Sequence, residues 1–155
     1  MLINRVLKIF AFSVEYFRYL CGNMSVLKSL DITSDEAIFF AARKGVRPTV
    51  FYHFAKTSQL PEKELARLIN LSARTISNYQ ERQKPLARVE SEHLLKLIAL
   101  YNKGETLFGS VAELNQWLHK PFWNRDDRPI DWLDTPSGVD LVMAELDRIA
   151  HGYVI

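Results

Sequence analysis

Closely spaced signals for helix starts and stops are the feature that most restricts the fold of this chain. Thr33 and Glu36 match a capping box, in which a hydroxyl and a carboxylate satisfy free N–H groups of the first helical turn. Ser110 and Glu113 repeat that pattern, and Gly45 stands where a left-handed residue would end the first helix. The chain beyond its N-terminal stretch is therefore expected to be a succession of short helices.

Apolar residues recur at helical spacing between these signals. The predicted helices cover residues 35–44, 48–57, 61–69, 73–82, 88–107, 111–119 and 136–150. Proline precedes an apolar run at several starts, where its missing N–H costs nothing, namely at Pro48, Pro61, Pro129 and Pro136. Because no segment shows sustained alternation of apolar and polar residues, strands are not expected. The sequence predicts an all-α fold.

Composition argues against several classes of protein. The 155 residues are 48% hydrophobic and 25% charged, as in an ordinary globular protein. The single cysteine, Cys21, excludes a disulfide framework, and the four histidines stand on separate segments, so no metal site is expected. The acidic residues between Asp126 and Asp134 could be paired catalytic carboxylates, but a solvated loop is the preferred interpretation. We therefore expect no enzyme and no cofactor.

The N-terminal segment, residues 1–33, receives no domain assignment. It is rich in Phe and Tyr, but Arg5, Lys8 and Glu15 interrupt the apolar run, so neither a membrane span nor a secretion signal is convincing. An additional packing helix and a true start at Met24 both remain open. We expect a cytoplasmic protein that does not enter a membrane.

Residues 61–82 have the features of a helix-turn-helix. Ala66 is the small residue that such a motif needs where its two helices cross, and Asn70 stands at the turn position that requires a left-handed backbone. Ser72 can cap the second helix. The apolar residues that would fill the angle between the helices are Leu65, Ile69, Leu71 and Ile76. A plain helical hairpin inside a bundle is the competing interpretation.

The second helix of this motif has a face suited to reading DNA. With Ile76 turned inward, Ala73, Tyr79 and partly Gln80 are expected on the buried side. Arginine matches guanine and asparagine matches adenine in a major groove, which favours Arg74 and Asn78 as base contacts. The full set of predicted DNA-binding residues is Arg74, Thr75, Ser77, Asn78, Arg82 and Lys84, the last two as phosphate contacts.

The C-terminal part differs in charge and in aromatic content. Residues 105–155 carry four Lys and Arg against nine Asp and Glu, a local net charge of −5, whereas residues 1–60 carry eight against four. All three tryptophans stand in the C-terminal part, at Trp117, Trp123 and Trp132. Such a composition fits a protein-binding surface, although a small aromatic core would also explain each tryptophan.

The C-terminal residues resemble the toxin-binding domain of the Xre/MbcA/ParS-type antitoxins. The matching residues are Trp117-Leu118, Pro121, Pro129-Ile130-Asp131-Trp132-Leu133, Thr135, Gly138, Val142, Leu146, Arg148-Ile149 and Gly152. Upstream, Ala73-Arg74-Thr75-Ile76, Leu86 and Val89-Glu90-Ser91 resemble the Xre-like helix-turn-helix of the same family. The resemblance covers about residues 34–155.

The resemblance implies a helix-turn-helix domain at 34–108 followed by a toxin-binding domain at 109–155. It also implies an antitoxin of a type II toxin–antitoxin system, with a RES-domain toxin that degrades NAD as its partner and the operon's own promoter as its DNA. An acidic surface suits a basic NAD-binding cleft, and a homodimer is the expected assembly. The alternative is a free-standing transcriptional regulator whose C-terminal module only dimerises.

The last helix predicts where a toxin could be held. Val142, Leu146 and Ile149 form an apolar stripe that should be core. Beyond the stripe no intramolecular partner is obvious for Arg148, His151 or the tail 153–155, and this apolar tail with its free carboxylate could enter a partner's cleft. The predicted toxin-binding residues are Asp131, Trp132, Arg148, His151, Tyr153, Val154 and Ile155. A tail that folds back onto the last helix is the open alternative.

Overall fold

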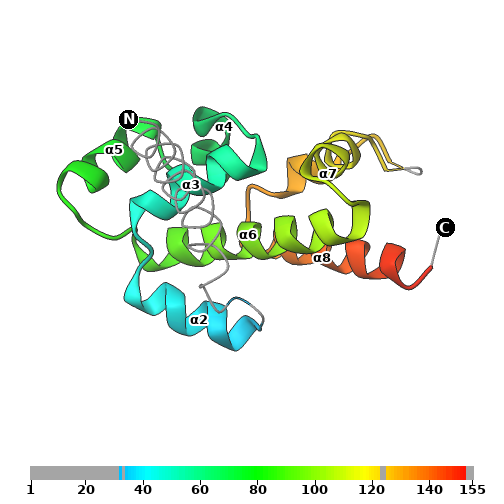
Figure 1. The fold of residues 1–155 in the computed structure, drawn as a ribbon, viewed down its shortest axis with the longest axis horizontal. Coiled ribbons are helices and arrows are strands. Elements are labelled where there is room, and N and C mark those ends of the chain that lie inside the picture. Colours follow the sequence, from blue (N-terminus) through cyan, green and yellow to red (C-terminus); the bar gives the residue numbers. More distant parts are fainter. Residues whose placement is uncertain (1–31, 33, 123–124, 153–155) are drawn as a thin grey trace, which may run out of the picture. The chain divides into compact units, whose positions relative to one another are not determined.

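A computed structural model describes residues 32, 34–122 and 125–152, which form one compact unit. Every regular element in these residues is helical, as predicted (Figure 1). The α-helices are α2 (Asp35–Lys44), α3 (Pro48–Ser58), α4 (Glu62–Leu68), α5 (Ala73–Glu81), α6 (Arg88–Phe108), α7 (Val111–Leu118) and α8 (Pro136–Ala150). A 3₁₀ helix, η1 (Pro129–Trp132), precedes α8. The segment 1–31, with its possible start at Met24, lies outside the described residues.

Helix α6 forms the centre of the unit. It is 21 residues long and packs against α2, α3, α7 and α8 (Figure 1). Its fully buried residues are Ser91, Leu94, Leu95, Leu97, Ile98 and Leu100. Because one helix carries so much of the core, its apolar side chains hold the elements before it and after it in a single structure.

Two ion pairs connect α6 to α8. Lys96 Nζ lies 2.7 Å from Asp140 Oδ2, and Lys103 forms the same kind of pair with Asp147. Both pairs join residues 44 positions apart, so the two helices run side by side in the same direction. Val142 and Leu146 of α8 are buried, which confirms two of the three residues of the predicted apolar stripe, while Ile149 is half-buried. Val139 of α8 is buried as well.

Side-chain caps explain where most helices begin. Ser34 caps α2, since its hydroxyl accepts a hydrogen bond from the Ala37 N–H, whereas Thr33, the predicted cap, lies outside the described residues. The capping hydroxyl is therefore found one residue later than predicted. Ser34 has the extended backbone that an N-cap needs. Ser110 and Thr135 cap α7 and α8 in the same way.

Chain turns after helices fall at residues with a left-handed backbone. Gly45 ends α2 with φ of 80°, as predicted, and a side chain at this position would press against Pro85. Gly109 ends α6 with φ of 87°. Within the described residues, no helix has both the length and the apolar character that crossing a membrane would need.

Candidate functional sites

Helices α4 and α5 form the predicted helix-turn-helix. Ala66 is buried where the two helices cross, and Asn70 has the left-handed φ of 58° that the turn requires. The Leu71 N–H donates to the Ala66 carbonyl over 2.9 Å and closes the turn. The Ser72 hydroxyl accepts from the Thr75 N–H at 3.0 Å and so caps α5, as expected.

The buried side of α5 is rotated from the predicted one. Ile76 is fully buried, and Thr75 and Tyr79 are half-buried, but Ala73 and Gln80 are exposed. Helices α3 and α4 both pack against α5. Ala73 and Gln80 lie on the other side of Ile76 from Thr75 and Tyr79, and both are open to solvent.

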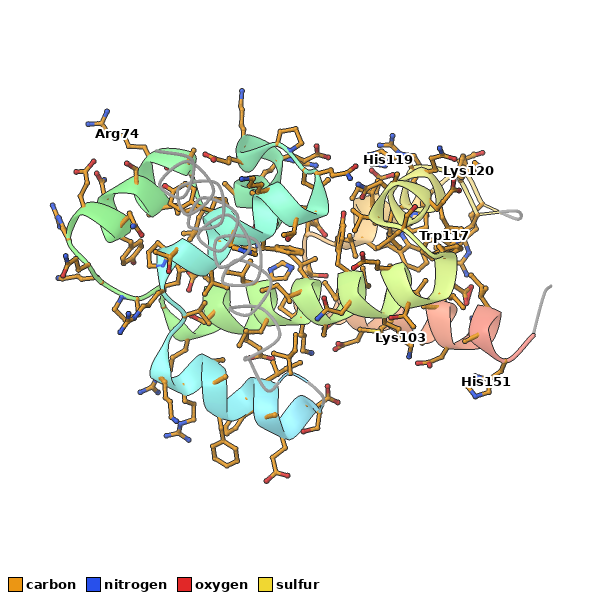
Figure 2. The ribbon with its side chains drawn as sticks, in the orientation of Figure 1. Arg74, Lys103, Trp117, His119, Lys120 and His151 are labelled. Carbon is orange, nitrogen blue, oxygen red and sulfur yellow. The ribbon has the colours of Figure 1, made fainter. Side chains whose placement is uncertain are left out.

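The predicted DNA-binding residues lie along α5 and the loop after it. Arg74 and Asn78 are exposed, and Figure 2 shows the Arg74 side chain extending away from the unit. Arg82 and Lys84 are also exposed. Thr75 and Ser77 are half-buried and already hydrogen-bonded: Thr75 Oγ1 to Ser72 Oγ at 2.8 Å, and Ser77 Oγ to Glu81 Oε1 at 3.3 Å.

Among the predicted toxin-binding residues, Asp131 stands in an ion pair on η1. Its carboxylate accepts hydrogen bonds from Arg128 Nε at 2.9 Å and from Arg128 Nη2 at 2.8 Å. These bonds lower the pKa of Asp131 and raise that of Arg128. The pair is exposed, so a partner meets a charged, hydrogen-bonded surface here and not an isolated carboxylate.

Trp132 is the centre of a half-buried aromatic group. The Trp132 ring is half-buried. The Phe122 ring centroid lies 4.8 Å from the Trp132 ring centroid, and the Arg125 guanidinium lies 5.6 Å from that same centroid. Arginine over a tryptophan face is a favourable cation–π arrangement. Trp and Arg are also among the residue types that carry protein-binding energy most often, and Phe is enriched at protein interfaces.

The predicted residues at the end of α8 do have intramolecular partners, contrary to expectation. Arg148 Nη1 donates to Glu145 Oε2 at 2.7 Å, one turn earlier on the same helix. His151 Nδ1 lies 2.7 Å from the Asp147 carbonyl oxygen, which gives α8 a side-chain bond at its C-terminal end. Both residues remain exposed. The predicted contacts Tyr153, Val154 and Ile155 lie outside the described residues, as does Trp123.

The predicted DNA-binding and toxin-binding surfaces lie apart, but hydrogen bonds join the two parts of the chain that carry them. Arg74 and His151 lie at opposite ends of the unit (Figure 2). Between them, Asn70 of the helix-turn-helix donates a hydrogen bond to the Asp134 carbonyl, and Asn115 of α7 donates one to the Ser58 carbonyl of α3. These bonds span 64 and 57 residues, and local sequence pattern gave no sign of them.

The acidic residues between Asp126 and Asp134 are exposed to solvent. The described residues contain no group of three or more His, Cys, Asp or Glu side chains placed to hold a metal ion. Asp126, Asp127 and Asp134 of the acidic loop are all exposed to solvent. The loop therefore has the solvated character that the preferred interpretation of these aspartates expects.

Known families match both parts of the chain. The antitoxin Xre-like helix-turn-helix domain matches residues 40–99, and the antitoxin Xre/MbcA/ParS C-terminal toxin-binding domain matches residues 103–152. The two matches follow one another with a gap of a few residues inside α6.

This succession of domains on an all-helical unit defines an antitoxin of a toxin–antitoxin system. The chain belongs to the Xre/MbcA/ParS-type antitoxins. A Pseudomonas putida protein named Antitoxin Xre is 27% identical to it over 139 residues, which is 89% of this chain and 86% of the relative.

Proposed function

We propose that this antitoxin blocks a RES-type toxin that degrades NAD, and that it represses its own promoter as a homodimer. DNA binding is assigned to residues 34–108 and toxin binding to residues 109–155. The observation that carries the proposal is the match of a toxin-binding domain directly after a helix-turn-helix whose reading face is exposed. No catalytic role is included.

The DNA-binding half of the proposal rests on α5. Arg74 and Asn78 are one helical turn apart and exposed, so both can reach base edges in a major groove. Arg82 and Lys84 follow on the adjacent loop, where they would contact phosphates. Because helix-turn-helix dimers read two half-sites, a homodimer would require a promoter with twofold symmetry.

The toxin-binding half rests on the surface of η1 and the end of α8. Asp131 and Trp132 present an ion pair and an aromatic ring side by side, next to Phe122 and Arg125. The net charge of −5 over residues 105–155 suits the basic cleft expected of an NAD-degrading toxin. Arg148 and His151, with the tail residues 153–155, would extend this contact.

Co-expression with the toxin tests the proposal. The gene neighbouring that of the antitoxin is expressed in a bacterial host, and growth and cellular NAD are followed with and without the antitoxin. Wild-type chain should prevent both NAD loss and growth arrest. A chain lacking residues 151–155 should remain folded and bind promoter DNA while it protects less well.

Three outcomes would change the proposal. Growth arrest without NAD loss would replace the RES-type toxin with another class. Full protection by the shortened chain would move the contact from the tail to the η1 surface around Trp132. Promoter binding without any protection would favour the free-standing regulator, whose C-terminal part serves only to dimerise.

A further inference from the structure

Asn70 has a role that the helix-turn-helix alone does not require. Its backbone is left-handed, with φ of 58°, a conformation that glycine adopts without cost. The side chain is nevertheless used, since Asn70 Nδ2 donates to the Asp134 carbonyl oxygen over 3.2 Å. The turn that sets the position of α5 is thereby bonded to the segment between η1 and α8.

A second side chain holds the same segment. His93 of α6 is only 2% exposed, and its Nε2 donates to the Leu133 carbonyl oxygen over 2.8 Å. The carbonyls of two consecutive residues, Leu133 and Asp134, are therefore bonded to side chains from the helix-turn-helix part. Of these two bonds, that of Asn70 is exposed and that of His93 is buried.

We define the junction as Asn70, His93, Leu133 and Asp134. An electrostatic effect also acts between the two parts that this junction joins. Arg67 of α4 contributes to the lowered pKa of Asp131, after the larger effect of Arg128. A protein that binds Asp131 or Trp132 would act on the segment that the junction fixes to the helix-turn-helix.

We propose that Asn70 is a positioning residue that couples toxin binding at η1 to promoter binding at α5. The inference rests on the proposed function. When a toxin shifts η1, the Asn70 bond is strengthened or lost, and the turn that orients α5 changes with it. Coupling of this kind is reciprocal, so promoter DNA changes toxin affinity by the same factor.

The test compares variants that differ in the Asn70 side chain. Asn70→Gly removes the donor but keeps the left-handed backbone, and Asn70→Asp keeps the size while replacing the donor with an acceptor. Gln59→Gly is the matched control, because Gln59 also has a left-handed φ, of 59°, and is exposed, with no side-chain hydrogen bond among the described residues.

Affinity for a DNA duplex of the gene's own upstream region is measured for each full-length chain, with and without saturating toxin. In the wild type and in Gln59→Gly, toxin should change DNA affinity by about fivefold or more, the usual scale of such coupling. In both Asn70 variants the change should fall below about twofold, while each ligand alone still binds.

Hydrogen exchange of the free chain provides a readout that needs no ligand. Amides from Ile130 to Asp134 should exchange faster in Asn70→Gly than in wild type or Gln59→Gly, because the junction opens more often. Equal exchange in all chains, or undiminished coupling in both Asn70 variants, would overturn the inference. A wild-type chain that binds neither toxin nor DNA would instead refute the proposed function.

Discussion

Gly138, in the first turn of α8, lies directly against the main-chain carbonyl of Trp132. A Cβ atom at position 138 would lie 1.8 Å from that carbonyl oxygen, far inside contact distance, and 2.9 Å from the Thr135 hydroxyl oxygen. The contact locks η1 onto the start of α8, and with it the aromatic surface around Trp132. The absence of a side chain is therefore a condition for the shape of the proposed toxin-binding surface.

Replacing Gly138 with alanine should destabilise the chain. The added methyl group meets main-chain atoms that cannot move without displacing η1, and overpacking of this kind costs about 1–3 kcal/mol. We expect a lower free energy of unfolding in urea, together with weaker protection against the toxin. Ser137→Ala, at the exposed neighbouring position, is the control and should behave like wild type. Unchanged stability of Gly138→Ala would show that η1 can separate from α8.

The reading face of α5 should carry sequence specificity. Arg74→Ala and Asn78→Ala should each weaken binding to the specific promoter site by about 1–3 kcal/mol, with little effect on unrelated DNA. Lys120→Ala removes a positive charge at the other end of the unit (Figure 2) and is the control for net charge. Fluorescence anisotropy with labelled duplexes measures the affinity for the promoter site and for unrelated DNA. Promoter affinity that survives the double substitution would exclude α5 as the reading helix.

Lys84 should act differently, because a phosphate contact carries no sequence information. Lys84→Ala is expected to weaken binding to specific and unrelated duplexes alike. The slope of log affinity against log salt should become less steep by roughly one unit, as one released counterion is lost. A loss confined to the specific site would mean that Lys84 reads a base.

The junction histidine predicts a pH dependence of stability. Burial lowers the pKa of His93 below its ordinary value of 6.5, against smaller opposing effects of the Leu133 hydrogen bond and of Asp134. The charge of Lys96 lowers the pKa of His93 further, and the charge of Glu92 raises it. Since the unfolded chain takes up this proton more readily, the free energy of unfolding is highest above about pH 6.5 and falls as pH drops through the folded pKa.

His93→Gln isolates this contribution. The glutamine amide can still donate to the Leu133 carbonyl, but it does not titrate. Between about pH 7.5 and 5, urea unfolding should show a smaller loss of stability in His93→Gln than in wild type. Parallel curves for the two chains would mean that His93 is protonated as easily in the folded state as in the unfolded state.

Local sequence signals were sufficient for the helices and for the turn of the reading motif. The predicted ranges of α2 and α8 agree with the structure at both ends, because hydroxyl caps, prolines and a positive-φ glycine act within a few residues. Asn70 was identified by the same reasoning, since few residue types tolerate its backbone. The segment η1 was missed as an element, as four residues are too few to show a period.

Other features depend on which helices pack against one another in the folded chain, and local sequence patterns do not specify this packing. The sequence pattern predicts Ala73 and Gln80 on the buried side of α5, but both are exposed, because the packing of neighbouring helices decides which side is covered. The partner of Arg148, Glu145, lies one turn away and could have been recognised from its spacing. The bond from Asn70 to Asp134 could not, because it spans 64 residues.

The continuity of α6 limits how antitoxins of this type can exchange parts. The helix extends for roughly 30 Å, and it supplies Ser91 to the loop before α3 as well as Lys96 and Lys103 to α8. A recombination point at residue 109 leaves both lysines with the DNA-binding half. A chimera joined there would keep these two ion pairs only when the incoming half carries acidic residues at the positions of Asp140 and Asp147. Toxin specificity would then be inherited together with the charge pattern of one helix.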